Sequence, residues 1–143
     1  MKKRKTDYVG FYETLVEQIK EYKGKKEEII ELTPELFKLM TNLLEDHRIP
    51  KKAKPLINAA IAYFVTPYDV VPEEVYGPIA FMDDIFICLY VIKKLKDIID
   101  EQLLEDNWDG VEQIMDIVDD IYLSVEKYIG EDKEKILDYV GIK

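Results

Sequence analysis

The stretch LINAAIAYFVTPYDVVPEEVYGPIAFMDDIFICLYVI, residues 56–92, decides the fold because it places two apolar runs on either side of a proline-rich connection. The first run predicts a helix over about 51–64 that ends before Pro67, since the residue before a proline is pushed out of the α region. The second run predicts a helix over about 78–104 that is apolar nearly all round near its start, which is typical of a central helix. A short connection makes consecutive helices antiparallel neighbours, so we predict a helical hairpin.

Helical periodicity also dominates before the hairpin, and strand-like alternation is scarce. We expect a first helix with Thr6 as N-cap and Gly24 just beyond its end, followed by a helical turn in 25–32. A longer helix should then begin with Thr33 as N-cap and Pro34 at its first position.

Two further helices are predicted after the hairpin. Asp109 and Glu112 have the spacing of a capping box, which predicts a helix that starts there and ends at Gly130. Residues 132–140 form a short closing helix. The expected fold is all-α, one compact domain over 1–143 with five or six helices around the central hairpin.

Composition and charge limit the classes of protein. The chain has 143 residues, is 48% hydrophobic and carries a formal charge of −10, most of it after residue 55. An acidic body disfavours nucleic acid as a partner, because phosphate binding needs a basic surface. Since the basic start MKKRK is not followed by an apolar run and no stretch is long enough to span a bilayer, we expect a cytoplasmic protein, with membrane association as the alternative. The single cysteine, Cys88, is expected to be a small buried side chain.

Several kinds of catalytic group are scarce. His47 is the only histidine and Ser124 the only serine, and the six glycines form no phosphate-binding loop. A serine or cysteine triad would have to use His47, which is more simply a surface residue beyond a helix end. The sequence leaves open whether the protein is an enzyme, and these absences weigh against it.

The connection between the two apolar runs is explained first as a structural turn. Thr66 can cap a turn with Pro67 at its first position and Asp69 at its third. Pro72 restricts the backbone further along, and Gly77 with Pro78 begins the next helix.

The aspartate pair that follows the connection is harder to explain. With the second helix starting at Pro78, Asp83 and Asp84 lie too deep for ordinary capping, and Asp84 shares a face with apolar residues. We therefore expect Asp84 to point into the protein and to accept hydrogen bonds from Tyr63, Thr66 or turn N–H groups, as a clamp on the turn. This structural clamp is the preferred interpretation.

The alternative interpretation is a site for Mg²⁺ or Ca²⁺, ions that prefer oxygen ligands. Asp69, Glu73, Asp83 and Asp84 are its candidate ligands, with hydrolysis as the chemistry they could support. The clamp requires neither a metal nor any other cofactor. We predict no catalytic residues and no organic cofactor.

Residues 43–95 resemble the YkvA-like family, a domain of unknown function numbered 1232. The pattern that carries the resemblance is ordered over about fifty residues. Its members here are Arg48, Pro50, Tyr63, Pro67, Asp69, Pro72, Glu73, Gly77, Asp83 and Asp84. The resemblance implies a small helical hairpin module without an established activity, and the flanks, 1–42 and 96–143, lie outside it.

The leading functional hypothesis is a non-enzymatic helical domain that binds a protein partner, with the membrane surface as one setting for it. It is motivated by the missing catalytic groups, the apolar hairpin and ten tyrosines, a residue type enriched at interfaces. The cation-dependent carboxylate site is the second hypothesis, and an integral membrane hairpin is a third. The sequence leaves the identity of the partner and homo-oligomerisation open.

Overall fold

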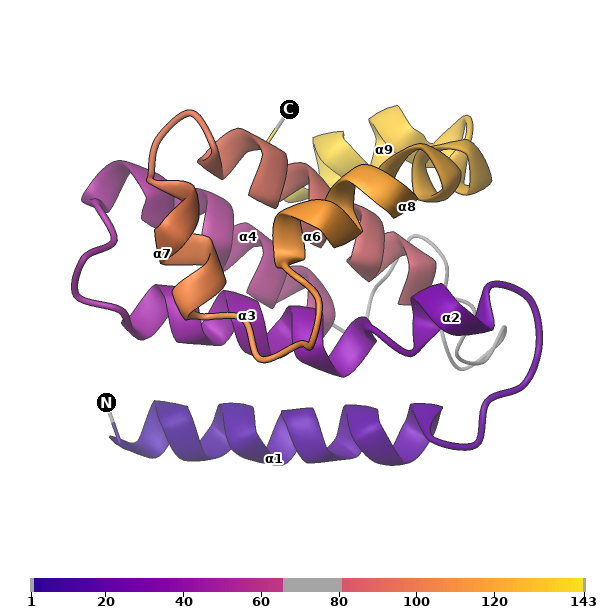
Figure 1. The fold of residues 1–143 in the computed structure, drawn as a ribbon, viewed down its shortest axis with the longest axis horizontal. Helices are drawn as coiled ribbons and strands as arrows, with labels where there is room; N and C mark the ends of the chain where they lie inside the picture. The colour runs from indigo at the N-terminus through magenta and orange to yellow at the C-terminus, as the bar shows by residue number, and fades with distance from the viewer. Residues whose placement is uncertain (1, 66–80, 143) are drawn as a thin grey trace.

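The structure is a computed structural model that describes the backbone of residues 2–65 and 81–142, with side chains from residue 9 onward within those ranges (Figure 1). The described residues are largely helical and contain no strand, which confirms the predicted all-α fold. In chain order the elements are α1 (Lys2–Ile19), α2 (Glu27–Ile30), α3 (Thr33–Glu45), the 3₁₀ turn η1 (Lys51–Ala53), α4 (Lys54–Val65), α6 (Met82–Leu95), α7 (Glu101–Asp106), α8 (Ile114–Ile129) and α9 (Asp132–Val140).

Helix α6 is the centre of the fold. Eleven of its 14 residues are buried, because α3, α4, α8 and α9 all pack against it. The last turn of α4 lies against the first turn of α6, so these two helices form the predicted antiparallel hairpin. Helix α1 lies on the outer side of α3, and α8 and α9 cover the opposite side of the molecule (Figure 1).

Three phenylalanine rings connect the outer helix to the hairpin. The ring of Phe37 on α3 lies 4.9 Å from that of Phe11 on α1 and 5.1 Å from that of Phe64 on α4, measured between centroids. Phe37 is fully buried, and tilted or edge-on aromatic pairs of this kind add to the stabilisation from burial. The rings therefore fix the distance of α1 from α4 through α3.

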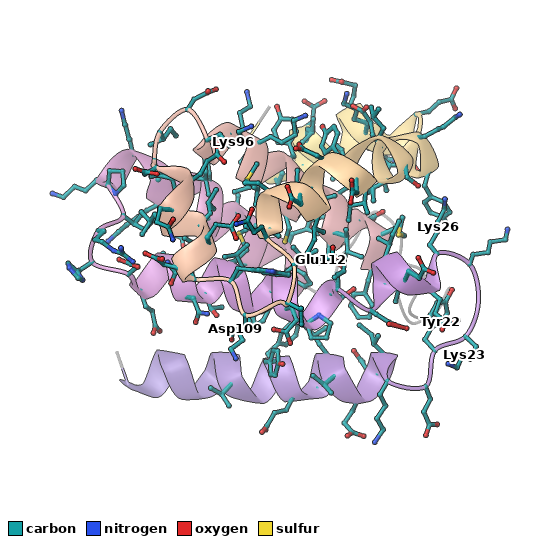
Figure 2. All side chains as sticks on the ribbon, viewed as in Figure 1. Tyr22, Lys23, Lys26, Lys96, Asp109 and Glu112 are labelled. Carbon is teal, nitrogen blue, oxygen red and sulfur yellow. The ribbon has the colours of Figure 1, made fainter. Side chains whose placement is uncertain are left out.

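The first helix differs from the prediction at both ends. It begins at Lys2, so Thr6 lies inside α1, and it ends at Ile19 rather than near Gly24. The turn after it is closed by Tyr22, whose hydroxyl donates to the carbonyl of Lys25 at 2.8 Å. Figure 2 shows Tyr22 in the connection between α1 and α2. Helix α2 lies within 25–32, where a helical turn was predicted, and confirms that prediction.

Helix α3 begins one residue earlier than expected. Leu32 is its N-cap, and the hydroxyl of Thr33 donates to the carbonyl of Ile30 at 2.6 Å instead of accepting from the helix start. The side chain of Thr33 is fully buried, so this bond gives its hydroxyl the partner that burial requires.

The predicted helix over 78–104 is divided. Helix α6 ends at Leu95, and α7 starts after Asp100, whose backbone is extended and whose carboxylate accepts from the N–H of Gln102 at 3.0 Å. Asp100 is thus an N-cap inside a run that periodicity alone treats as continuous. Because of this division and the short α2, the described residues contain more helices than the five or six that were predicted.

Helix α8 also starts differently from the prediction. It begins at Ile114, with Gln113 as N-cap, so Asp109 and Glu112 do not form a capping box. Glu105 of α7 takes that role, because its carboxylate oxygens accept from the N–H groups of Ile114 at 3.0 Å and Met115 at 3.3 Å. The cap comes from another helix, where a local pattern cannot show it.

The end of α8 and the final helix match the prediction. Gly130 follows α8 with a positive φ of 57°, a backbone conformation that glycine adopts without strain, and α9 covers Asp132–Val140. Among the described residues, no helix is both long and apolar enough to cross a membrane. The division into a 43–95 core and two flanks stays a prediction.

Candidate functional site

The aspartate pair lies at the start of α6. Asp83 and Asp84 are each 2% exposed and belong to the first turn of the helix, not to its sixth and seventh positions as predicted. A helix N-terminus favours negative charge, so this position itself stabilises both carboxylates. The predicted burial of Asp84 is confirmed, and the burial of Asp83 is an addition from the structure.

Tyr63 connects the pair to the other helix of the hairpin. Its side chain is 1% exposed, and its hydroxyl donates to Oδ2 of Asp83 at 3.1 Å. The predicted tyrosine–aspartate contact therefore exists, with Asp83 in the place expected for Asp84. The ring of Tyr139 on α9 covers that of Tyr63 edge-on, with 5.7 Å between centroids. Helices α4, α6 and α9 thus meet at this point.

Cys88 lies one turn further along α6 and is fully buried, as predicted. Burial raises the pKa of its thiol well above the usual value, and the negative charge of Asp84 raises the pKa further. Because a thiol acts as a nucleophile or metal ligand when deprotonated, Cys88 is an inert core residue.

The other candidates of the aspartate site fall in the connection. Thr66, Pro67, Asp69, Pro72, Glu73 and Gly77 all lie outside the described residues. Within residues 9–65 and 81–142 there is no group of three or more His, Cys, Asp or Glu side chains that could hold a metal ion. The four-carboxylate cation site and the clamp on the turn both stay predictions.

Arg48, from the predicted family pattern, connects α3 to α7. Its guanidinium binds Oδ2 of Asp46 at 2.7 Å and Oδ2 of Asp106 at 3.0 Å, and the side-chain amide of Asn107 donates to Asp46 at 3.0 Å. The hydrogen bonds from Arg48 and Asn107 hold the pKa of Asp46 well below its usual range. This arginine fixes the bend after α3, while His47 beside it is exposed, as expected.

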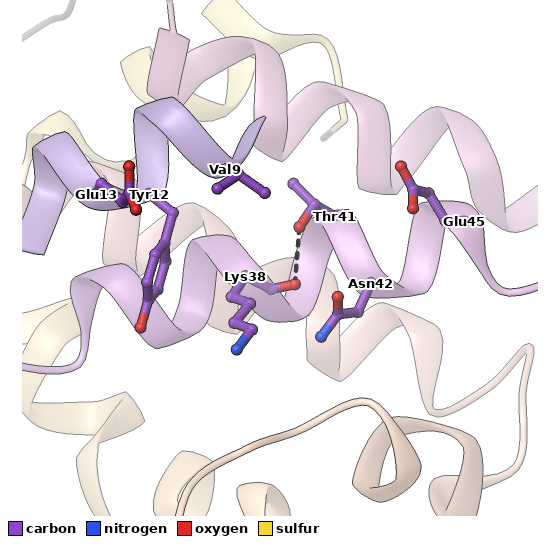
Figure 3. Close-up of a pocket in the computed structure, with 7 residues that line it drawn as sticks. All are labelled: Val9, Tyr12, Glu13, Lys38, Thr41, Asn42 and Glu45. Atoms are coloured by element: carbon purple, nitrogen blue, oxygen red, sulfur yellow. Dashed lines mark hydrogen bonds between the residues drawn. The ribbon is translucent and has the colours of Figure 1, made fainter. Parts of the chain in front are cut away.

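A second candidate site is a groove between α1 and α3, which we call the α1–α3 groove (Figure 3). It has a volume of about 290 Å³. Its lining side chains come from one face of each helix, namely Val9, Tyr12 and Glu13 of α1 and Lys38, Thr41, Asn42 and Glu45 of α3. Val9 is 50% exposed and forms an apolar part of the wall.

Hydrogen bonds hold the polar groups of the groove in place. The hydroxyl of Tyr12 donates to Glu35 at 2.6 Å, that of Thr41 donates to the carbonyl of Lys38 at 3.0 Å, and the amide of Asn42 donates to the carbonyl of Asn107 at 3.2 Å. The hydrogen bond to Glu35 raises the pKa of Tyr12. The groove is therefore a preformed surface rather than a loose gap.

The loop before α8 approaches Lys38, one of the lining residues of the groove. The ammonium of Lys38 lies 2.6 Å from Oδ2 of Asp109, which raises the pKa of Lys38, and Figure 2 labels Asp109 in this loop. Two residues later Val111 is fully exposed. The nearby Trp108 fixes this loop by donating from Nε1 to the carbonyl of Glu112 at 2.9 Å.

No sequence pattern pointed to the α1–α3 groove. The spacing of Lys38, Asn42 and Glu45 shows that they share a face of α3, which is the usual sign of a solvated surface. What makes a groove of that face is the position of α1, and this depends on packing between segments far apart in the sequence.

These features define a small all-helical domain built on a hairpin whose second helix carries two buried aspartates. Residues 53–90 match the family model described as a protein of unknown function (DUF1232). The chain is also 32% identical over 126 residues to the uncharacterised protein ORF9 of Methanothermobacter thermautotrophicus, covering 88% of this chain and 86% of that protein. The chain belongs to the DUF1232 family, which confirms the resemblance stated above.

The family match covers the described residues of the aspartate site but not the α1–α3 groove. Tyr63, Asp83 and Asp84 lie within the matched residues 53–90, whereas α1 and α3 precede them. No solved structure matches the chain. The hairpin is thus the part common to the family model, and the α1–α3 groove belongs to the flank.

Proposed function

We propose that this chain is a non-enzymatic helical domain that binds a protein partner through the α1–α3 groove. The proposed setting is the cytoplasm, including the surface of a membrane. The observation that carries the proposal is the groove itself, a preformed hollow of about 290 Å³ between two helices. Hollows between helices are a common place for a bound segment, because side chains of the partner can be buried there.

An exposed apolar side chain supports this use. Val9 in the wall is half exposed. It would lose contact with water when a partner covers the groove, and burial of apolar surface is the main favourable term in protein association. Single exposed side chains are ordinary, so the argument rests on the position of Val9 beside a hollow.

The polar groups of the groove favour binding over catalysis. Nucleophilic catalysis needs a hydroxyl or thiol next to a base that can take its proton. Here the Thr41 hydroxyl donates to a backbone carbonyl, which is not a base. The Tyr12 hydroxyl donates to the Glu35 carboxylate, but this bond raises the pKa of Tyr12 and so disfavours the phenolate. The Lys38 ammonium pairs with Asp109, which raises the pKa of Lys38 and keeps it protonated. These groups stabilise the walls of the groove, and a binding surface requires no further chemistry from them.

Photo-crosslinking from the groove tests the proposal. A photoreactive phenylalanine analogue replaces Val9 in one variant and Leu123, which is 73% exposed on α8, in a control variant. We expect a crosslinked protein at Val9 that is absent at Leu123, with its mass distinguishing a partner from a second copy of this chain. Equal patterns at both positions, together with a monomeric elution volume, would contradict the proposal.

The cation-dependent site is the alternative function, and the burial of two adjacent carboxylates favours it. Asp83 and Asp84 repel each other at close range, and a hard cation held with Asp69 and Glu73 would reduce that repulsion. Binding at a hundred times Kd would add about 2.7 kcal/mol to the unfolding free energy, so millimolar Mg²⁺ or Ca²⁺ should raise the melting temperature above that in chelator. Asp84→Asn should remove the difference, and identical melts of the natural protein would exclude this function.

A further inference from the structure

We infer that the occupant of the α1–α3 groove is a basic amphipathic segment of the partner, one that carries Lys or Arg beside an apolar side chain. This inference rests on the proposed function and adds the chemistry of the partner. It follows from the charges at the rim of the groove, from their hydrogen-bond partners and from the shape of the hollow.

Among the side chains that the structure describes, from residue 9 onward, negative charge predominates around the groove. The carboxylates of Glu13, Glu35, Glu45 and Asp109 line or adjoin it, together with the ammonium of Lys38. Asp109 already pairs with Lys38, and Glu35 accepts from the Tyr12 hydroxyl.

The two remaining carboxylates are available to a partner. Glu13 on α1 and Glu45 on α3 are both exposed, and neither forms an ion pair with another described residue. They stand on opposite walls of the same hollow (Figure 3). A cationic side chain placed over the groove can pair with either of them, whereas an acidic segment would be repelled.

The hollow itself requires an apolar group. A dry cavity of roughly 150 Å³ holds one benzene ring, so about 290 Å³ has room for one or two apolar side chains. Val9 in the wall would contact such a side chain. An apolar side chain in the hollow with basic residues on either side matches both features, which is the pattern of an amphipathic basic helix laid into a groove.

Salt dependence is the expected sign of this attraction. The net charge of −10 comes from residues 56–143, which carry −13, whereas residues 1–55, which include α1 and α3, carry +3. The attraction is therefore expected from Glu13 and Glu45 at the groove and not from the charge of the whole chain. The attraction should weaken as salt screens it, because the Debye length falls from about 10 Å at 0.1 M to about 3 Å at 1 M.

Three labelled peptides of about 14 residues, or four helical turns, test the inference by fluorescence anisotropy with the full chain. All share one stripe of leucines, and their polar positions carry lysine, glutamate or glutamine. We expect the lysine peptide to bind most tightly, with an affinity that falls with added NaCl. Equal binding of the three would overturn the inference and leave the proposed function standing. A preference for the glutamate peptide, or no binding at all, would also overturn it.

Two double variants locate the contact. Glu13→Gln with Glu45→Gln should weaken the lysine peptide by about fivefold to tenfold, the effect of losing two exposed ion pairs. The control, Asp119→Asn with Asp120→Asn, changes the net charge by the same amount at two exposed positions of α8 and should change affinity less than twofold. A similar loss in both variants would show a general charge effect and would overturn the assignment to the groove. Circular dichroism of the natural protein and of both double variants checks that each is folded.

Discussion

Replacing Glu105 by alanine removes both acceptors that α7 provides to the start of α8. Its Oε1 accepts from the N–H of Ile114 at 3.0 Å and its Oε2 from that of Met115 at 3.3 Å. These are the first two N–H groups of α8, and the N-cap residue Gln113 makes no side-chain bond to them. Ile114 is fully buried, so water cannot easily replace the lost carboxylate.

The expected loss follows from those two bonds. A hydrogen bond to a charged acceptor contributes about 1.5 kcal/mol or more, and the longer bond, from Met115, contributes less. The negative charge of the half-buried carboxylate stabilises the helix N-terminus by about 0.5 kcal/mol in addition. Loss of a side-chain cap costs about 0.5–2 kcal/mol in general, so we expect about 2 kcal/mol for Glu105→Ala. For a chain of this length that corresponds to a melting temperature lower by about 6–8 °C.

Urea denaturation and thermal melting measure this loss, and two further variants make the result specific. Glu105→Gln keeps one carbonyl acceptor without the charge and should lose about half as much. Glu112→Ala should change the unfolding free energy by less than about 0.5 kcal/mol, since its side chain is exposed and does not cap the helix. A Glu105→Ala protein as stable as the natural one, or a larger loss in Glu112→Ala, would refute the assignment of the cap.

Three further variants test other contacts. A Cβ at Gly110 would clash with the indole ring of Trp108, so Gly110→Ala should lower the unfolding free energy by about 1–3 kcal/mol. It should also shift the fluorescence emission of this single tryptophan, and unchanged fluorescence and stability would contradict the clash. Tyr63→Phe leaves the buried carboxylate of Asp83 without this donor and should cost about 1.5–3 kcal/mol in urea denaturation, where a loss below about 0.5 kcal/mol would be inconsistent with the bond. The pKa of Asp46 is lowered in the folded protein, so its contribution to stability is complete above about pH 5 and is lost as the pH falls from about 3.9 towards the folded value. Asp46→Asn should therefore flatten the acid side of the stability profile, and parallel acid slopes for the two proteins would count against this.

Periodicity predicted which parts of the chain are helical, and the errors lie at helix ends whose partners are distant in sequence. Residues 132–140 and the stop at Gly130 were predicted correctly, because the signals for them are local. The Asp109–Glu112 spacing was a valid local pattern, but Asp109 pairs with Lys38 of α3 instead. An ion pair across 71 positions of the chain was not visible in a window of four residues.

The same distinction applies to the candidate sites. The burial of Asp84 could be predicted because apolar residues share its face of the helix. The burial of Asp83 could not, since it depends on α6 being covered on nearly every side by other helices. The α1–α3 groove is the extreme case, because each of its walls is an ordinary solvated helix face until the two helices are placed side by side.

The position of that groove nevertheless depends on the hairpin. Phe37 of α3 lies between Phe11 of α1 and Phe64 of α4, so packing of the rings relates α1 to a helix inside the family match. Protein interiors are close-packed and transmit small shifts, so a change at Phe64 should move the walls of the groove although it lines no part of it. The hairpin of the family match thus adjoins the proposed binding surface through Phe64 and Phe37, and under the proposal the residues that select a partner lie on α1 and α3.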